Sequence, residues 1–229
     1  MNSLLGNGAL VTVFSLTLAA ISPSLGSKAM LTSPTRIAST APVGDKQMMD
    51  NSQGGMGSCM MCMELGPSDT QYDLRFIDAM TPHHQGAVEM AQDALSKSQR
   101  PEIKRLAHYI ITDQNQEIKQ MKQWRQAWYP KVSDTALVYD THMGHTMAMS
   151  KAQMQDMMMK GNLGPADAQY DLRFLNAMIP HHQGAVVMAT DALNKSQRPE
   201  IKSLAQRIIT NQQREIAQMQ QWRQQWYQQ

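Results

Sequence analysis

The residues best suited to chemistry in this sequence are paired histidines that stand among methionines, in a pattern that occurs twice. The first copy reads Met-Thr-Pro-His-His-Gln-Gly-Ala from Met80, and the second reads Met-Ile-Pro-His-His-Gln-Gly-Ala from Met178. Another methionine, Met90 or Met188, follows seven residues after the first histidine of each copy. Thioether sulfur and imidazole nitrogen suit a soft or borderline cation, so Cu(I) is the first metal that this pattern predicts.

Helical spacing places several of these donors together. At 100° per residue, Met80, His83 and Met90 fall within one arc of about 80°. We expect His83 on the shoulder of the apolar stripe, within reach of both the core and solvent. His84 lies on the other side of Met80, where a histidine that is satisfied within the core and a metal ligand are equally good interpretations.

A methionine on the following helix joins this set if the two helices pack in register. Met121 is that residue in the first copy, although Met80 and Met121 also fit the apolar periods of their helices as ordinary core residues. The candidate metal ligands of the two copies are His83, His84, Met80, Met90 and Met121, with His181, His182, Met178, Met188 and Met219.

Methionine is also concentrated outside the two copies. Of the 21 methionines, six lie in residues 48–63 and seven in residues 143–159. An exposed methionine gains nothing by burial and invites oxidation, so these segments make physical sense as soft-metal ligands. Within the second segment, His142 and His145 are three residues apart and can ligate one ion from one side of a turn. We add these two histidines, with Met143 and Met147, to the candidate ligands.

The only two cysteines, Cys59 and Cys62, stand in the first Met-rich segment. An oxidising compartment favours a disulfide. The two-residue gap and the neighbouring methionines favour a metal site with two thiolates instead. Both interpretations stay open, and both cysteines are candidate ligands.

The N-terminal residues 1–27 have the pattern of an export signal. An apolar run at residues 9–21 is long enough for a signal segment and too short for a comfortable membrane span, although no Lys or Arg precedes it. An uncleaved anchor or an apolar helix are the alternatives. We expect a soluble periplasmic protein without stable membrane insertion after cleavage, in which the Ser-, Thr- and Pro-containing residues 28–65 form a flexible arm rich in Met and Cys.

The remainder of the chain contains an internal duplication. Residues 66–129 align with residues 164–227 without a gap, and 47 of these 64 positions are identical. Each copy, residues 66–130 or 164–229, predicts two amphipathic helices. In the first copy, one starts at Pro67-Ser68-Asp69 and ends near Lys97, and the next runs from Pro101 to Trp128. Residues 131–163 form a linker rich in Met and His, with a short helix within residues 150–160.

Two helical hairpins of near-identical sequence bury their apolar stripes most simply against each other. We therefore predict a four-helix bundle with approximate two-fold symmetry. Because no segment has the period of a strand, the expected class is all-α.

The motif Met-x-x-His-His-x-x-Ala with a later Met-Ala, followed by a helix with Glu-Ile-x-x-Met, resembles the domain-of-unknown-function family DUF305. The resemblance covers about 130 of the 229 residues. It implies a ferritin-like helical bundle, copper binding and a role in copper resistance. By motif position it implies that His83, His84 and Met90, with His181, His182 and Met188, are the functional residues.

The function that these features predict is non-enzymatic copper binding. We expect sequestration or transfer of Cu(I), with Cu(II) and Ag(I) as further ions. The expected partners are copper ions and a copper efflux or sensor protein, and a net charge of only +2 with few aromatic residues excludes a nucleic-acid surface.

Two alternatives stay open. A methionine-rich surface can grip partner helices, so the chain could serve as an interaction module. A ferritin-like metal oxidase is less consistent with the sequence, because that chemistry needs Glu-x-x-His motifs. Met80 stands three residues before His83, and Glu89 is replaced by Val187 in the second copy.

Overall fold

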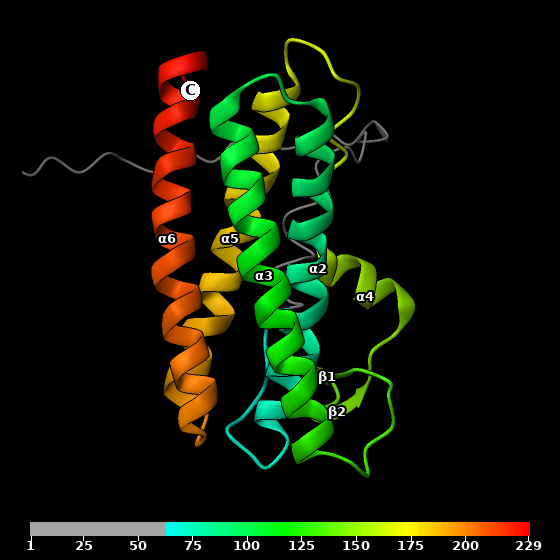
Figure 1. Cartoon of the computed structure of the whole chain (residues 1–229). Coiled ribbons are helices and arrows are strands. Elements are labelled where there is room, and N and C mark those ends of the chain that lie inside the picture. Colours follow the sequence, from blue (N-terminus) through cyan, green and yellow to red (C-terminus); the bar gives the residue numbers. More distant parts are fainter. Residues whose placement is uncertain (1–62) are drawn as a thin grey trace, which may run out of the picture. The chain divides into compact units, whose positions relative to one another are not determined.

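The structure is a computed structural model that describes residues 63–229, and this range is mostly helical. Four long helices lie side by side, with the shorter elements beside α2 (Figure 1). In chain order the elements are α2 (Tyr72–Lys97), α3 (Pro101–Trp128), β1 (Leu137–Asp140), β2 (His145–Ala148), α4 (Lys151–Met158), α5 (Tyr170–Lys195) and α6 (Pro199–Tyr227). The expected signal segment, most of the arm and both cysteines lie outside the described residues.

Helix α2 begins five residues later than the start signal at Pro67 predicts. The backbone N–H of Asp69 donates to the carbonyl of Pro67, and the Asp69 carboxylate accepts from the N–H of Gln71. The buried guanidinium of Arg75 donates to the carbonyls of Leu65 and Pro67. These bonds use the backbone groups in a turn, and the helix starts only after it.

Prolines begin the second helix of each pair, as the sequence predicts. Pro101 is the first residue of α3 and Pro199 is the first residue of α6. A proline lacks the N–H that would have no partner at this position, and its fixed φ suits the first turn of a helix.

The expectation that the chain has no strand is wrong in the linker. β1 and β2 form an antiparallel hairpin in which Leu137 lies opposite Ala148 and Asp140 lies opposite His145. The turn contains Gly144, whose φ of +70° is a conformation that glycine adopts without strain. Strands of four residues are too short for an alternating pattern to be distinguished from a loop.

Asp78 anchors this hairpin to α2. Its carboxylate accepts hydrogen bonds from the backbone N–H of Leu137 at 2.9 Å and from Nε of Arg125 at 2.5 Å. Burial raises the pKa of Asp78, while the bonds from Arg125 and Leu137 oppose that rise. The equivalent residue of the second copy is Asn176, which accepts from Arg223 at 3.2 Å.

The short helix in the linker occupies Lys151–Met158, within the range predicted for it. Ser150 caps its N-terminus: the Ser150 hydroxyl accepts from the N–H of Gln153, and the Gln153 side chain accepts from the N–H of Ser150. This reciprocal capping box stabilises a helix that is otherwise too short to persist alone.

The core is built jointly by the two sequence copies. One buried cluster joins the first half of α2 to the second half of α5 and the first half of α6, and it contains Phe76. The other joins the first half of α5 to the second half of α2 and the first half of α3, and it contains Phe174. Burial of each phenylalanine contributes about 1.5–3 kcal/mol to stability. Each pair of helices therefore depends on the other pair for its core.

Paired hydrogen bonds tie α2 to α5. The hydroxyl of Tyr72 donates to Asp191 at 2.8 Å, and that of Tyr170 donates to Asp93 at 2.9 Å. Burial and the neighbouring carboxylate raise the pKa of both tyrosines, so both hydroxyls remain donors at neutral pH. Because the two bonds lie at opposite ends of the helices, they fix α2 and α5 antiparallel and in register.

None of the helices within residues 63–229 is long and apolar enough to cross a membrane.

Candidate metal centre

Two histidines from the duplicated motif face each other where α2 and α5 meet. The ring centroids of His83 and His181 lie 3.9 Å apart, with the ring planes inclined by 47°. His83 is 0% exposed and His181 is 1% exposed. The expected place of His83 on a shoulder open to solvent is therefore wrong. The helix wheel places it correctly at the edge of its own stripe, but α5 covers that edge.

Among residues 63–229, neither ring nitrogen of His83 has a hydrogen-bond partner, and Nδ1 of His181 has none either. Such buried polar atoms are rare and need an explanation. Burial lowers the pKa of His83 well below its ordinary value of 6.5, and the other three histidines of the motif lower it further. Burial likewise lowers the pKa of His181 to about 3. Both imidazoles are therefore neutral at physiological pH, which is the form that binds metals.

Met63, from the segment that precedes α2, lies beside this pair. A Cβ added at Gly184 would lie 2.4 Å from Met63 Cε, 3.1 Å from Met63 Sδ and 3.2 Å from His83 Nε2. Only glycine leaves room here, and the thioether of Met63 and the free nitrogen of His83 occupy the same neighbourhood. Gly184 thus has a packing role: because it has no side chain, it leaves space for Met63 beside the two histidines.

A similar arrangement occurs at the other copy of the motif. A Cβ added at Gly86 would lie 1.8 Å from the backbone oxygen of Met158, at the end of α4. The same oxygen lies 3.2 Å from Nε2 of His181 and is placed to accept a hydrogen bond from it. One histidine of the pair therefore meets a thioether, and the other meets a backbone carbonyl.

The second histidine of each motif is held by a glutamate. Nε2 of His84 lies 2.8 Å from Glu117 Oε2, and Nε2 of His182 lies 2.7 Å from Glu215 Oε2. Both histidines are 0% exposed, while their Nδ1 atoms have no partner in the protein. Glu117 lies on α3 and Glu215 lies on α6. In each sequence copy, the glutamate of the second helix therefore bonds to a histidine of the first helix. This bond fixes the orientation of the ring.

The predicted methionine ligands of the two helical copies are all buried, but they group across the copies. Met80 and Met121 share a cluster with Met188 of the second copy, whereas Met90 lies in the other cluster with Met178 and Met219. Met90 therefore packs apart from Met80 and Met121, which it was expected to join if the hairpin is in register. The antiparallel crossing of α2 and α5 brings the end of one helix to the start of the other. Met188 of the second copy, rather than Met90, therefore packs with Met80 and Met121.

Met90 already has a partner for its sulfur. The backbone N–H of Gly161 donates to Met90 Sδ at 3.4 Å. This weak bond holds the chain after α4 against α2.

The predicted ligands of the linker lie on the β1–β2 hairpin, away from the core. His142 and Met143 are in the turn, and Met143 is 70% exposed; His145 and Met147 are on β2 and are exposed. Asp140 accepts hydrogen bonds from the backbone N–H groups of His142 and Met143, and these bonds lower its pKa. The turn places exposed imidazoles and thioethers beside a carboxylate that stays charged.

Among residues 63–229, no three side chains of His, Cys, Asp or Glu are placed to hold one metal ion. Met63 is a thioether donor in the same neighbourhood, because its Sδ and His83 Nε2 both lie close to the position of a Cβ at Gly184. Two imidazoles and a thioether in an apolar surrounding form a donor set for Cu(I) rather than for a hard cation.

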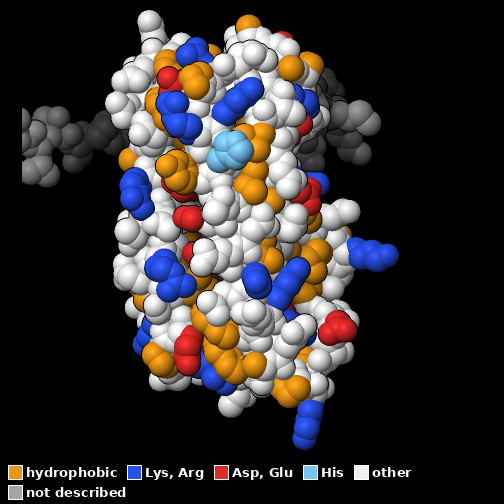
Figure 2. All heavy atoms as spheres, viewed as in Figure 1, with side chains coloured by type: hydrophobic (Ala, Val, Ile, Leu, Met, Phe, Trp, Pro, Cys, Tyr) orange, Lys and Arg blue, Asp and Glu red, His pale blue; other side chains and the backbone are white. Residues whose placement is uncertain are grey.

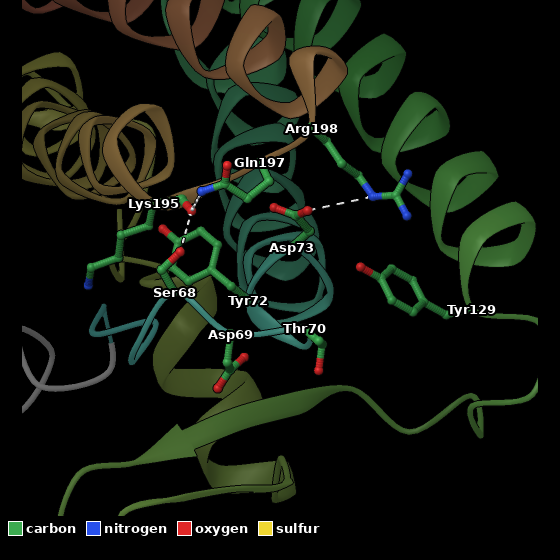
Figure 3. A pocket seen from close by; sticks show the side chains of 9 residues that line it. All are labelled: Ser68, Asp69, Thr70, Tyr72, Asp73, Tyr129, Lys195, Gln197 and Arg198. Carbon is green, nitrogen blue, oxygen red and sulfur yellow. Dashed lines mark hydrogen bonds and ion pairs between the residues drawn. The ribbon is translucent and has the colours of Figure 1, made fainter.

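An open pocket at one end of the helices contains neither histidine nor methionine. It has a volume of about 660 Å³ and lies where the start of α2 meets the turn between α5 and α6. Figure 3 shows that its walls are charged and hydroxyl side chains, with Asp73 directed toward Arg198 at 3.6 Å. This pocket offers no donors for a soft metal.

Sequence reasoning missed Met63 as a candidate ligand. The duplication gives no signal for it, because residue 161, its equivalent in the second copy, is a glycine. It also missed the role of Glu117 and Glu215 as partners of His84 and His182. The sequence did contain a signal for this role, because the two glutamates recur at equivalent positions of the second helix in each copy.

Residues 73–223 match the family described as "Domain of unknown function (DUF305)". A single match thus spans both sequence copies. Three solved structures of CopM align with 68% of this chain and 97% of that chain. The Cu(I)-bound form is 44% identical with a TM-score of 0.53, the Cu(II)-bound form is 43% identical with 0.54, and a silver-bound form obtained by soaking is 39% identical with 0.53.

A curated relative, "Uncharacterized protein L153" of Acanthamoeba polyphaga mimivirus, is 47% identical over 49 residues. The match covers 21% of this chain and 32% of that protein, so the chain spans about a third of the length of this relative.

Proposed function

The chain belongs to the DUF305 family, and from this premise we propose that it is a copper-binding protein that holds Cu(I) between the two facing histidines of its core. The observation that carries the proposal is the pair His83 and His181, whose buried, neutral rings lie 3.9 Å apart. Both ring nitrogens of His83 and Nδ1 of His181 have no hydrogen-bond partner among residues 63–229. Met63 supplies the thioether that completes the set. Soft sulfur ligands favour Cu(I), and imidazole accepts either oxidation state of copper.

The similarity to CopM supports this proposal. CopM has been solved with Cu(I), Cu(II) and silver bound, and it is similar to this chain over most of its own length. We extend the same ions to this chain, with Cu(I) preferred over Cu(II) and Ag(I). The proposed task is to sequester or transfer copper outside the cytoplasm, as part of copper resistance, together with a copper efflux or sensor protein.

The scaffold in this proposal is a four-helix bundle of the ferritin-like type. The antiparallel contact of α2 with α5 places equivalent histidines opposite each other, so the site needs both sequence copies. A bundle that encloses the ion keeps water away from it and limits oxidation of Cu(I) and of the thioethers. Burial of the ligands therefore suits a monovalent ion that must stay reduced.

Further donors lie outside the core and fit capture of copper at the surface. The exposed hairpin offers His142, Met143, His145 and Met147, and the arm offers Cys59 and Cys62. We propose that these are secondary sites of lower affinity, since the hairpin donors are exposed to water and are not held for one ion as the core histidines are. They would load before the core site or pass copper to it.

A catalytic role is not part of the proposal. The two glutamates that recur, Glu117 and Glu215, are engaged with His84 and His182. An interaction module is also less well supported, because Met80, Met121, Met178 and Met188 are buried and cannot form a surface for partner helices.

Competition with a Cu(I)-specific chelator tests the proposal. Wild-type protein is expected to retain Cu(I), whereas His83→Ala with His181→Ala is expected to lose the tightest site. His108→Gln is the matched control, because His108 is exposed and its equivalent is already Gln206. Circular dichroism checks that helicity persists.

Met63→Leu provides an independent arm if the alanine variants unfold. Leucine keeps the size and apolar character of methionine at a cost usually below about 1.5 kcal/mol, but it removes the sulfur. Weaker Cu(I) binding in a folded Met63→Leu variant supports the site. Wild-type protein that fails to compete for Cu(I), or folded variants that bind as tightly as the wild type, would reject it.

A further inference from the structure

Helices α3 and α6 meet along a seam at which equivalent residues of the two sequence copies face each other. A small cavity there is lined by four such pairs: Ile110 and Ile208, Asp113 and Asn211, Gln114 and Gln212, and Glu117 and Glu215. Its volume of about 10 Å³ accommodates one occupant of the size of a water molecule. Only one of the four pairs, Asp113 and Asn211, differs in residue type.

The two glutamines give the first sign of an occupant. Gln114 and Gln212 are each 3% exposed, and the carbonyl oxygen Oε1 of each has no hydrogen-bond partner within the described part of the chain, residues 63–229. An amide oxygen that is buried without a partner costs about 1–3 kcal/mol. Two such oxygens line the same cavity, so a single occupant that both can contact would remove both penalties.

Three carboxylates line the same cavity. Glu117 and Glu215 use Oε2 for His84 and His182, and Asp113 Oδ2 accepts from Asn211 Nδ2 at 3.4 Å. Their side chains are near enough to influence one another: after burial, the charges of Glu117 and Glu215 are the next causes of the raised pKa of Asp113. The seam therefore collects negative charge as well as carbonyl oxygens.

Two arginines, Arg105 and Arg214, line the adjoining groove together with three carboxylates. Arg214 is the one cation that lowers the pKa of Asp113, and its Nη2 donates to Asn211 Oδ1 at 2.7 Å rather than to a carboxylate. Oxygen donors, some charged and some amide carbonyls, are the ligands of hard cations. The absence of sulfur distinguishes this set from the donors around His83.

We propose that the seam between α3 and α6 binds one hard divalent cation through the carbonyl oxygens of Gln114 and Gln212 and the carboxylate of Asp113, with the charges of Glu117 and Glu215 close by. Ca²⁺ suits this mixture best because it accepts carboxylate and amide oxygens in flexible geometry, whereas Mg²⁺ demands a near-ideal octahedron and sheds water reluctantly. The site depends on the two amide oxygens, since His, Cys, Asp and Glu alone make no metal site within residues 63–229.

An ion can reach the seam from solvent. A groove of about 620 Å³ adjoins the cavity and shares Asp113, Asn211 and Glu215 with it. Figure 2 views the molecule with α3 and α6 in front, and acidic side chains are visible along the line between these helices. The carboxylates at the mouth of the cavity favour entry of a cation over that of an anion.

The seam also lies behind the histidines. Glu117 and Glu215 line the cavity and also hold His84 and His182, so the charge of the proposed ion would lie one residue away from these histidines. The proposal does not depend on copper binding, because its ligands and its ion belong to a different chemical class from those of the copper site.

The test uses the copper-free full chain. Isothermal titration with Ca²⁺, and the electron paramagnetic resonance signal of free Mn²⁺, are expected to give one site per chain. Asp113→Asn makes the pair identical to Asn211 and removes one ligand charge, so it is expected to weaken Ca²⁺ binding by about tenfold or more. Asn211→Asp adds a carboxylate and is expected to strengthen it.

Gln114→Met with Gln212→Met removes both amide oxygens at similar volume and is expected to abolish the site. Asp134→Asn, on the exposed linker, is the control that should bind like the wild type. Wild-type protein that binds neither Ca²⁺ nor Mn²⁺ at millimolar concentration overturns the proposal and assigns the cavity to water. Equal Ca²⁺ affinity in wild type, Asp113→Asn and the double glutamine variant overturns it as well. Cu(I) competition on the same variants is expected to be unchanged.

Discussion

His83 and His181 hold the same position in the two sequence copies, and their rings lie 3.9 Å apart at the contact of α2 with α5. A site formed by equivalent residues of both copies differs from two equal sites, one in each copy. The first prediction follows from this difference.

Single replacement of His83 or of His181 by alanine is expected to remove the tightest Cu(I) site completely rather than by half. The double variant should then show little further loss, because residues that bind one ion are strongly non-additive. Chelator competition with the three variants measures this. Two single variants that each keep one tight site, with losses that add in the double variant, would indicate separate sites.

Gly184→Ala is expected to weaken Cu(I) binding in a protein that stays folded. The new methyl group would meet Cε of Met63 at 2.4 Å, and this flexible end can move aside. The gain in helix propensity, about 1 kcal/mol, offsets part of the displacement. Thermal unfolding combined with Cu(I) competition separates affinity from stability; a folded variant with wild-type affinity would exclude Met63 as a ligand.

Gly86→Ala is expected to act in the opposite way, on stability. Its methyl group would lie 1.8 Å from the backbone oxygen of Met158, and a backbone atom cannot move aside as a methionine tip can. We expect a loss of about 1–3 kcal/mol in the free energy of unfolding, typical of overpacking. Urea unfolding measures this loss. Ala217→Gly, at an exposed position of α6, is the comparison for helix propensity alone.

Acidification is expected to destabilise the copper-free protein. Burial lowers the pKa of His181 from 6.5 to about 3 and lowers that of His83 in the same direction. Below pH 6.5 the unfolded chain takes up protons that the folded chain does not, so the free energy of unfolding falls as pH decreases toward 3. Each histidine contributes a slope of about 1.4 kcal/mol per pH unit in this window.

Urea unfolding of wild type and His181→Gln between pH 7.5 and 5 tests the pH prediction, because glutamine does not titrate. The stability difference between the two proteins should shrink as the pH falls. A difference that stays constant over this range would contradict a lowered pKa of His181.

Asp78→Asn is expected to loosen the β1–β2 hairpin. Asp78 is 4% exposed and joins Arg125 to the backbone N–H of Leu137. Loss of the charged acceptor should cost about 1–3 kcal/mol and speed amide exchange at Leu137. Asn176→Asp, at the equivalent position, is the control and should leave exchange in the hairpin unchanged.

Much of the fold was predictable because the duplicated helices have clear apolar periods. Pro101 begins α3 as predicted, and the helix predicted in the linker appears within its expected range as α4. The hairpin of β1 and β2 was not predictable, because its strands are too short to carry a pattern. The start of α2 was missed because Asp69 and Arg75 hold the preceding backbone in a turn.

The sequence by itself determined which donors this protein has: paired imidazoles, thioethers at helical spacing and glutamates one helix away. It also determined that each donor set occurs twice, because the two copies are identical at most of their aligned positions. Only the tertiary structure decided which donors meet. The antiparallel crossing of α2 and α5 places His83 against its equivalent His181 and buries it, and it packs Met188 rather than Met90 with Met80. The sequence could not predict these contacts, because helical periodicity describes one helix and does not specify the neighbour that packs on it.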